Sequence, residues 1–324
     1  MKSFKIALLV CLALGGIFFF NIFAHVIFTW LNTPGSHLDL PRFFEINFLI
    51  KVFRFPAAIT LILFGFIAFE CWRLGYANSA LKRLLNQATD ASAHEDVVYF
   101  YITVSGIGRL LSLLMGLGIG YWLNRQIEIY FGLSLLRQAH PILQFVALVV
   151  ADSFFMYWEH RLMHTRFLWE IHKVHHAATD FNGINSFRVH PIEGVVGMPF
   201  RAIPAALLGI RPDVLVAFSL LNTVYQIAVH SRLDWGRGWL GRYLIINPSR
   251  HQIHHSSEQR YWDKNFSVLT IYDRLFGTWQ DLDANSAKTP VGFDDDHLHN
   301  RRKPVQAMFL ICIRWIKGLL GRTP

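Results

Sequence analysis

Residues 157–176 read YWEHRLMHTRFLWEIHKVHH, and five of these residues are histidines. The HxxHH spacing of residues 172–176 returns in HQIHH at residues 251–255. On an α-helix, side chains at positions i, i+3 and i+4 project from one face. We therefore expect each HxxHH segment to present three imidazoles in one direction, and the HRLMH segment at residues 160–164 to present two.

These three segments offer eight imidazoles, and that number predicts the kind of site. Eight are too many for one tetrahedral zinc ion and suit two ions with roughly four or five ligands each. Imidazole binds Zn, Cu, Fe and Ni alike, so the spacing alone leaves the metal open. We expect His230 to be a further ligand, His190 to be a ligand or to line the site, and no catalytic residue beyond the ligands. The complete set of expected ligands is His160, His164, His172, His175, His176, His230, His251, His254 and His255.

Carboxylates near these segments are candidates to hold the histidine rings, because a metal-bound imidazole usually donates its second ring N–H to a carboxylate or a carbonyl. Asp152 is the strongest candidate, since it lies in an apolar segment two helical turns before His160, where an unpaired carboxylate is costly. A plain hydrogen bond between helices is the alternative role for Asp152. The other candidates are Glu159, Glu193, Asp234 and Asp263.

The composition indicates an integral membrane protein. Of the 324 residues, 53% are hydrophobic and only 16% are charged, whereas a typical soluble domain has about 25% charged residues. This disfavours an ordinary soluble enzyme, a disordered chain and a disulfide scaffold. The net charge of +9 fits basic loops beside anionic lipid headgroups better than a nucleic-acid partner, because no soluble basic face is visible.

Apolar segments long enough to cross a bilayer as helices dominate the first half of the chain. The first is read as a retained transmembrane helix, because it is too long for the apolar region of a signal peptide. The expected spans are residues 6–30, 53–72, 97–123 and 141–158.

Two shorter apolar segments, residues 194–210 and 214–229, predict a hairpin that either crosses the bilayer and returns or only dips into it. Residues 305–320 favour an amphipathic helix on the membrane surface, with an ordinary packed terminal helix as the alternative. The expected fold is an all-α integral membrane protein of about four transmembrane helices, the apolar hairpin and a cytosolic, histidine-rich helical cap.

Basic residues near the span ends predict the orientation. Lys2 and Lys5 keep the N-terminus inside, so four crossings and a returning hairpin place both histidine-rich regions on the cytoplasmic side. We expect three regions along the chain. They are an N-terminal transmembrane region of three spans (1–140), a catalytic domain (141–283) and a C-terminal tail with the amphipathic helix (284–324).

The histidine segments resemble those of the fatty acid hydroxylase/sterol desaturase superfamily, the membrane-bound histidine-box oxygenases. HRLMH, HKVHH and HQIHH follow one another in that order around an apolar hairpin. The resemblance covers about residues 145–282. Further similar segments are YWEHR at 157–161, RVHP at 188–191, DKNF at 263–266 and DRLFGTW at 273–279.

The resemblance implies a membrane-embedded non-haem di-iron oxygenase, with two Fe ions as cofactor and O₂ as co-substrate. It gives metal-ligand roles to the nine histidines named above. Members of the superfamily hydroxylate or desaturate lipids with two electrons from a reductase or a small redox carrier. We expect hydroxylation of an unactivated C–H bond, with a sterol or carotenoid desaturase or hydroxylase as the alternative. No NAD, flavin or cytochrome b5-like motif is visible, so we expect a separate electron donor, and we favour a bacterial inner membrane over the endoplasmic reticulum.

A membrane metal transporter is the alternative from another functional class. Transporters place their ligands within the spans near the bilayer midplane, with acidic and polar residues along the path. The histidines of this chain lie outside the expected spans, in charged segments, which favours the enzyme.

Overall fold

The structure is a computed structural model that describes residues 22, 46–108, 110–111, 119–283, 286, 289–293 and 298–320. The expected first span, residues 6–30, lies outside the described residues except for Ile22. The described residues form helices and two isolated β-bridges, with no longer strand among them. The all-α prediction is confirmed for this part of the chain.

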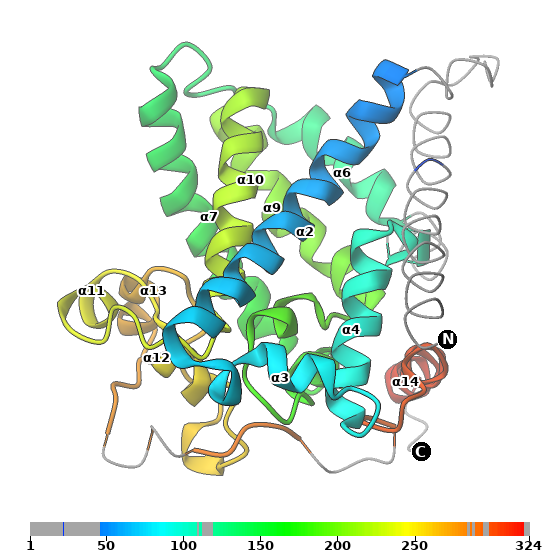
Figure 1. The fold of residues 1–324 in the computed structure, drawn as a ribbon. Helices are drawn as coiled ribbons and strands as arrows, with labels where there is room; N and C mark the ends of the chain where they lie inside the picture. Colours follow the sequence, from blue (N-terminus) through cyan, green and yellow to red (C-terminus); the bar gives the residue numbers. More distant parts are fainter. Residues whose placement is uncertain are drawn as a thin grey trace.

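Most of the long helices make up one layer of the molecule, and the short helices, their connecting loops and the longer helix α14 lie below it (Figure 1). The longer helices are α2 (Ile46–Leu74), α4 (Ala91–Val104), α6 (Ile119–Phe131), α7 (Pro141–Met163), α9 (Pro191–Leu208), α10 (Pro212–Val229) and α14 (Pro304–Leu319). The shorter ones are η2 (Tyr76–Asn78), α3 (Ala80–Leu85), α8 (Trp169–His176), η3 (Gly183–Phe187), α11 (Trp239–Tyr243), α12 (Pro248–His254), η4 (Gln259–Tyr261) and α13 (Thr270–Leu275).

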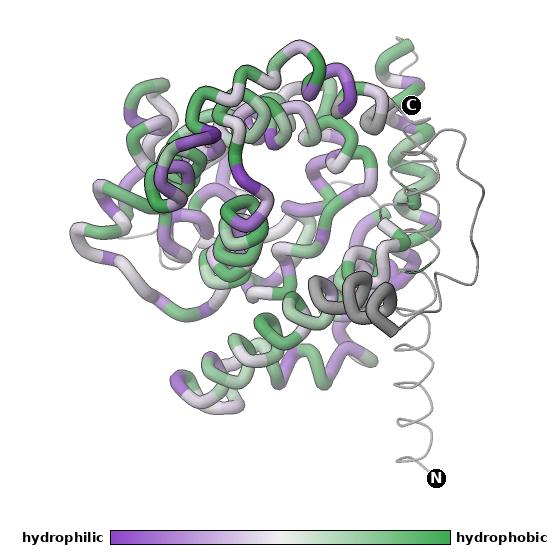
Figure 2. Tube along the Cα trace, turned by 90° about the horizontal axis from the view of Figure 1, so that it is seen from above, coloured by the Kyte–Doolittle hydropathy of each residue, from purple (hydrophilic) through white to green (hydrophobic). Residues whose placement is uncertain are grey.

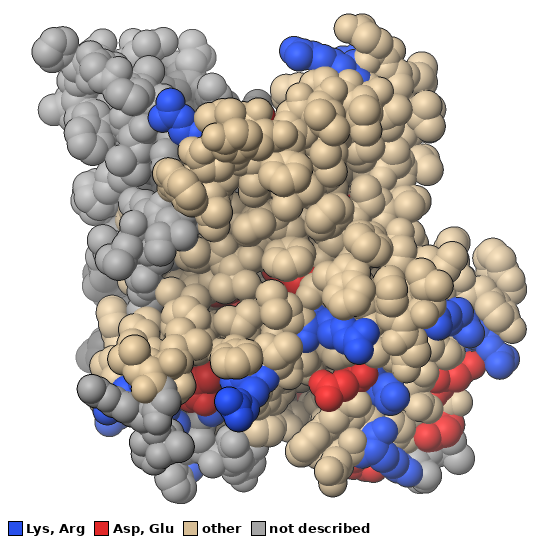
Figure 3. Space-filling model, turned by 180° about the vertical axis from the view of Figure 1, so that it is seen from behind, with Lys and Arg blue, Asp and Glu red and all other residues tan. Residues whose placement is uncertain are grey.

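Three helices of the described residues are long and apolar enough to cross a membrane: Pro56–Leu74 within α2, α7 and α10. They match the expected second and fourth spans and the second arm of the hairpin. Charged side chains gather on the lower layer, while the surface over the long helices is almost free of them apart from its upper rim (Figure 3). In the view from above, the long helices are mainly hydrophobic (Figure 2). This distribution is that of a membrane protein with one polar side.

The expected hairpin is present as α9 and α10, and α9 packs against α6 and α7. Gly209 ends α9 with a φ of +66°, and a Cβ at this position would lie only 2.5 Å from the Cα of Ser134. The tight turn therefore requires glycine. Among these two arms, α10 is a candidate span and α9 is not.

The expectation of one continuous helix over residues 97–123 is wrong. α4 ends at Val104, Ser105 caps it, and Gly106 has a φ of +79°, which no α-helix contains. Helical residues resume at Ile107, directly after this break, and α6 begins at Ile119. The apolar run hid this break, because a glycine in such a run also fits a close contact between helices, as we had read Gly106.

Helix α14 confirms the helix expected at residues 305–320. Its buried face, which includes Ala307, Met308 and Ile311, packs against α4 and α8, as a terminal helix of a folded domain does. The apolar side chains Phe309 and Ile313 remain about half exposed. Contact of this face with a membrane surface stays a prediction.

Arg188 joins the loop before α9 to α4 and α8. Its guanidinium is completely buried and pairs with Glu95 at 2.9 Å and with Asp96 at 3.0 Å. Its Nε donates to the carbonyl of Val174 at 2.9 Å. A buried cation persists only when its hydrogen bonds and countercharges are all in place. The position of α8, which carries three histidines, therefore depends on this arginine.

Arg188→Met should destabilise the protein, because Glu95 and Asp96 would stay buried without their cation. We expect a loss of about 3–5 kcal/mol in the free energy of unfolding, seen as a lower thermal midpoint in detergent. The control Arg211→Met breaks an ion pair with Asp213 in which both side chains are about half exposed, and it should cost about 1 kcal/mol or less. Equal midpoints for Arg188→Met and wild type would contradict the anchoring role.

Candidate metal centre

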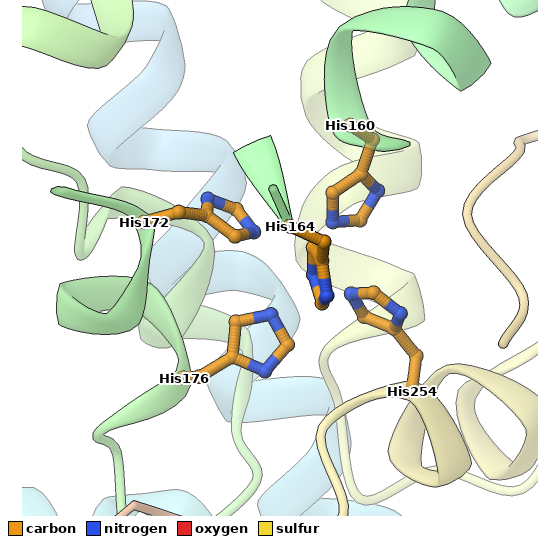
Figure 4. A group of neighbouring side chains, drawn as sticks. All are labelled: His160, His164, His172, His176 and His254. Atoms are coloured by element: carbon orange, nitrogen blue, oxygen red, sulfur yellow. The ribbon is translucent and has the colours of Figure 1, made fainter. Parts of the chain in front are cut away.

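Nine histidines converge in two groups, and within each group the ligand nitrogens lie within 4.8 Å of one another. The first group is His160, His164, His172, His176 and His254. Figure 4 shows its five rings turned toward one another from three separate parts of the chain. The second group is His175, His230, His251 and His255. The structure thus brings together the nine residues that the sequence singled out, in sets of five and four.

Helix geometry explains how each HxxHH segment serves both groups. In α8, His172 and His176 enter the first group and His175 enters the second. In α12 and its cap, His251 and His255 enter the second group and His254 enters the first. Successive residues differ by about 100° around a helix. The expectation that all three rings of a segment point in one direction is therefore corrected: the i, i+4 pair shares one group and the ring at i+3 reaches the other.

The other ligand positions lie at helix ends. His160 is in the last turn of α7 and His164 is its C-cap. His230 is the C-cap of α10. Both helices are candidate spans, so the two groups lie where these spans end.

The rings of the first group are held by hydrogen bonds at Nδ1. The Nδ1–H of His160 donates to the carbonyl of Phe266 at 2.9 Å, and that of His254 donates to the carbonyl of Lys264 at 2.7 Å. The Nδ1–H of His172 donates to Glu193 Oε2 at 2.9 Å. A ring that donates from Nδ1 carries its lone pair on Nε2. These contacts therefore set the tautomer that a metal ion needs.

The Nε2 atoms of the first group point at no other protein atom. All five are buried and have no hydrogen-bond partner among the described residues. Buried nitrogens are rarely left unpaired, and each such atom calls for an explanation. Five unpaired nitrogens of one group, all accessible to one point, fit a bound metal ion.

The second group gives the same indication through its nitrogen–nitrogen distances. The Nε2 atom of His230 lies 3.2 Å from that of His175 and 3.1 Å from that of His251. The Nδ1–H groups of His175 and His230 donate to backbone carbonyls, so two lone pairs face each other and cannot form a hydrogen bond. Nitrogens bound to one ion at about 2.1 Å lie roughly 3.0–3.4 Å apart. The observed spacing fits an ion between the rings.

Burial favours the neutral form of His176, His230 and His254, which is the form that binds metal. Burial lowers the pKa of His230 to about 4. Burial, followed by the neighbouring histidines, lowers the pKa values of His176 and His254 well below the usual 6.5. At neutral pH the lone pairs of these rings are therefore available.

Two of the candidate carboxylates contact the histidines. Glu193 accepts from His172, as given above, and Asp263 Oδ1 lies 3.2 Å from Nδ1 of His164. The sequence had missed the backbone carbonyls that hold four further rings, since a carbonyl carries no residue-type signal.

The other candidates make different contacts. Asp234 accepts from Ser249 Oγ at 2.7 Å and pairs with Arg237. Asp152 is buried near the charges of Arg201 and Glu159. In the described residues, no hydrogen bond joins Asp152, Glu159 or Asp234 to any of the nine rings, which corrects that part of the prediction.

His190 lies outside both groups and caps a helix. Its Nδ1 accepts from the backbone N–H of Ile192 at 3.2 Å, and its Nε2–H donates to the carbonyl of Met308 at 3.0 Å. Both ring nitrogens are therefore engaged. His190 joins the start of α9 to α14, and the expectation that it binds metal or lines the site is corrected.

Cavities reach the histidines from two sides. A helix-side cavity of about 220 Å³ lies among α7, α9 and α10 and is lined by His160, His172, His175, His230 and His251. A loop-side cavity of about 270 Å³ is lined by His164, His176, His254 and His255 together with Trp169 and Trp262. Both cavities are therefore bordered by members of both histidine groups.

The part of the chain that carries the nine histidines is similar to a known protein family. Residues 145–278, which include all nine histidines, match the family model described as fatty acid hydroxylase. Alkylglycerol monooxygenase of Xenopus tropicalis is 30% identical over 163 residues, 50% of this chain and 35% of that protein. Ornithine lipid hydroxylase OlsE of Rhizobium tropici is 30% identical over 149 residues, 45% of this chain and 44% of that protein.

A third relative, the Delta(7)-sterol 5(6)-desaturase ERG3A of Gibberella zeae, is 24% identical over 202 residues, 60% of this chain and 49% of that protein. The matched segments thus span less than half of each of these three relatives. No solved structure gives a significant match. The family model and the named relatives together support the resemblance of residues 145–278, which carry both histidine groups, to the fatty acid hydroxylase/sterol desaturase superfamily.

Proposed function

We propose that this chain is a membrane-bound non-haem di-iron oxygenase that hydroxylates an unactivated C–H bond of a lipid. It would use O₂ and take two electrons from a separate reductase or small redox carrier. The observation that carries the proposal is the convergence of nine imidazoles, seven of them buried, in groups of five and four. Its chemical class is supported by relatives named as monooxygenase, hydroxylase and desaturase.

The donor set fits two metal ions, and the superfamily favours iron as their identity. Neutral imidazoles alone would accept Zn, Cu, Fe or Ni. When bound, a pair of iron ions would supply the activation of O₂ and the oxidation of the C–H bond, which no protein side chain can perform. The first group would hold one ion and the second group the other.

The protein itself would place the substrate. The helix-side cavity is walled by apolar residues of the spanning helices, such as Met156, Met163 and Val229, and it touches rings of both groups. A lipid chain in this cavity would present one carbon to the metal sites. Fixing that carbon supplies the proximity and orientation that a selective oxidation needs.

The location of the histidines favours an oxygenase over a metal transporter. The two groups lie at the ends of α7 and α10, and not at the middle of these spans. We place them on the cytoplasmic side of the membrane, for which a bacterial inner membrane is the favoured candidate. A sterol or carotenoid desaturase or hydroxylase remains the second candidate, since one relative is a sterol desaturase.

The purified protein should hold about two iron ions per chain, as measured by metal analysis and Mössbauer spectroscopy. His254→Ala should remove iron from the first group, because it deletes one of five converging Nε2 atoms. The matched control His94→Ala, on α4 and outside both groups, should keep the full iron content. A single bound zinc ion in wild type, or full iron content in His254→Ala, would contradict the proposal.

Lowering the pH should destabilise the metal-free protein. The folded-state pKa is about 4 for His230 and well below 6.5 for His176 and His254, so in this range the unfolded chain binds more protons than the folded one. Stability rises with pH wherever the unfolded state binds more protons. The free energy of unfolding should therefore reach its full value above about pH 6.5 and decrease as the pH drops toward about 4.

The measurement is the thermal midpoint of the metal-free protein in detergent, compared between about pH 7 and about pH 5. We expect a clearly lower midpoint at the acidic pH. An unchanged midpoint would mean that the rings are protonated in the folded protein.

A further inference from the structure

A polar wall interrupts the apolar lining of the helix-side cavity. Glu159 on α7 and Arg201 on α9 line it together, and the amides of Asn222 and Gln226 line it from α10. Glu159 Oε1 accepts from Arg201 Nη2 at 3.0 Å. A cavity that held only a hydrocarbon chain would not need an ion pair in its wall, because Glu159 lies within the candidate span α7, where a charge is costly.

One carboxylate oxygen of this pair has no partner. Glu159 is 8% exposed, and its Oε2 atom is buried without a hydrogen-bond partner among the described residues. Leaving a buried charged acceptor unpaired carries a substantial desolvation cost. The countercharge on Arg201 is already engaged by Oε1, so what the site lacks is a hydrogen-bond donor for Oε2.

The chain makes room for this ion pair. Gly197 on α9 has no side chain, and a Cβ at this position would overlap both Glu159 Oε1 and Arg201 Nη2. Arg201 Nε also donates to the carbonyl of Gly197 at 3.4 Å. The backbone of α9 thus fixes where Glu159 stands in the cavity wall.

We infer that the substrate is a lipid with an O–H or N–H group, which donates to Glu159 Oε2 close to the carbon that is oxidised. This inference rests on the proposed function and adds the class of substrate. Glu159 directly precedes His160 of the first group, and both line the same cavity. A donor bound at Glu159 therefore fixes the adjoining part of the lipid beside the metal sites. The neutral charge balance of the Glu159–Arg201 pair suits a hydroxyl or an amide better than a phosphate or a carboxylate.

Binding of matched lipid pairs to the protein in nanodiscs tests this inference without turnover. The first pair is 1-hexadecanol and its methyl ether, and the second is N-hexadecylacetamide and its N-methyl derivative, which lacks the N–H. Wild type should bind the donor-bearing member of at least one pair about tenfold more tightly, as one hydrogen bond to a charged group provides. The pair with the larger preference identifies hydroxyl or amide as the donor.

Two variants and one control assign the preference to this site. Glu159→Gln should abolish it, and so should Gly197→Ala, which keeps both charges but displaces them. The control Asp213→Asn alters an ion pair of the same kind, Arg211–Asp213, outside the cavity, and should keep the preference. Equal affinities within both pairs in wild type, or an intact preference in Glu159→Gln and Gly197→Ala, would overturn the inference.

Iron content separates this failure from a failure of the proposed function. Protein that holds iron but shows no donor preference overturns only the substrate class. Protein that shows the preference but binds no iron overturns the oxygenase.

Discussion

The convergence of nine imidazoles, seven of them buried, is the constraint on which the rest of the structure depends. Each ring costs free energy to bury unless its Nδ1–H has an acceptor. The chain provides acceptors from distant segments, including the carbonyls of Arg188, Lys264 and Phe266 and the carboxylate of Glu193. The helices that carry the histidines and the loops that carry the acceptors must therefore be placed together.

The loop after α12 shows how such a placement is achieved. Asp273 is completely buried, and its carboxylate accepts from the backbone N–H groups of Phe266 and Ser267 at 2.8 and 3.0 Å. Thr278 Oγ1 donates to the same carboxylate at 2.7 Å. The DRLFGTW segment thus orients the carbonyl that holds His160, although none of its residues belongs to either histidine group. Arg188 positions a second histidine in a similar way. Its guanidinium pairs with Glu95 of α4, and its carbonyl accepts a hydrogen bond from the Nδ1–H of His175.

The sequence predicted the elements whose signal is local. Spacing identified eight of the nine converging histidines, and the position of His230 directly after the apolar hairpin, together with the family resemblance, suggested the ninth. Hydropathy located α7 and α10. It failed where the deciding interaction joins distant residues. The capping role of His190 against Met308 and the carbonyl acceptors both depend on which segments meet in space. The division of each HxxHH segment between two groups follows from helix geometry, but it requires knowing that two groups exist.

The central claim is that two neighbouring metal ions are bound almost entirely by imidazole nitrogen. X-ray absorption spectroscopy at the iron K-edge of the purified protein tests it most directly. We expect a first shell of nitrogen at about 2.1 Å, with the outer-shell carbon scattering of four to five imidazoles per ion, in line with groups of five and four histidines. A first shell containing sulfur, or one dominated by oxygen with one or two imidazoles, would contradict the claim.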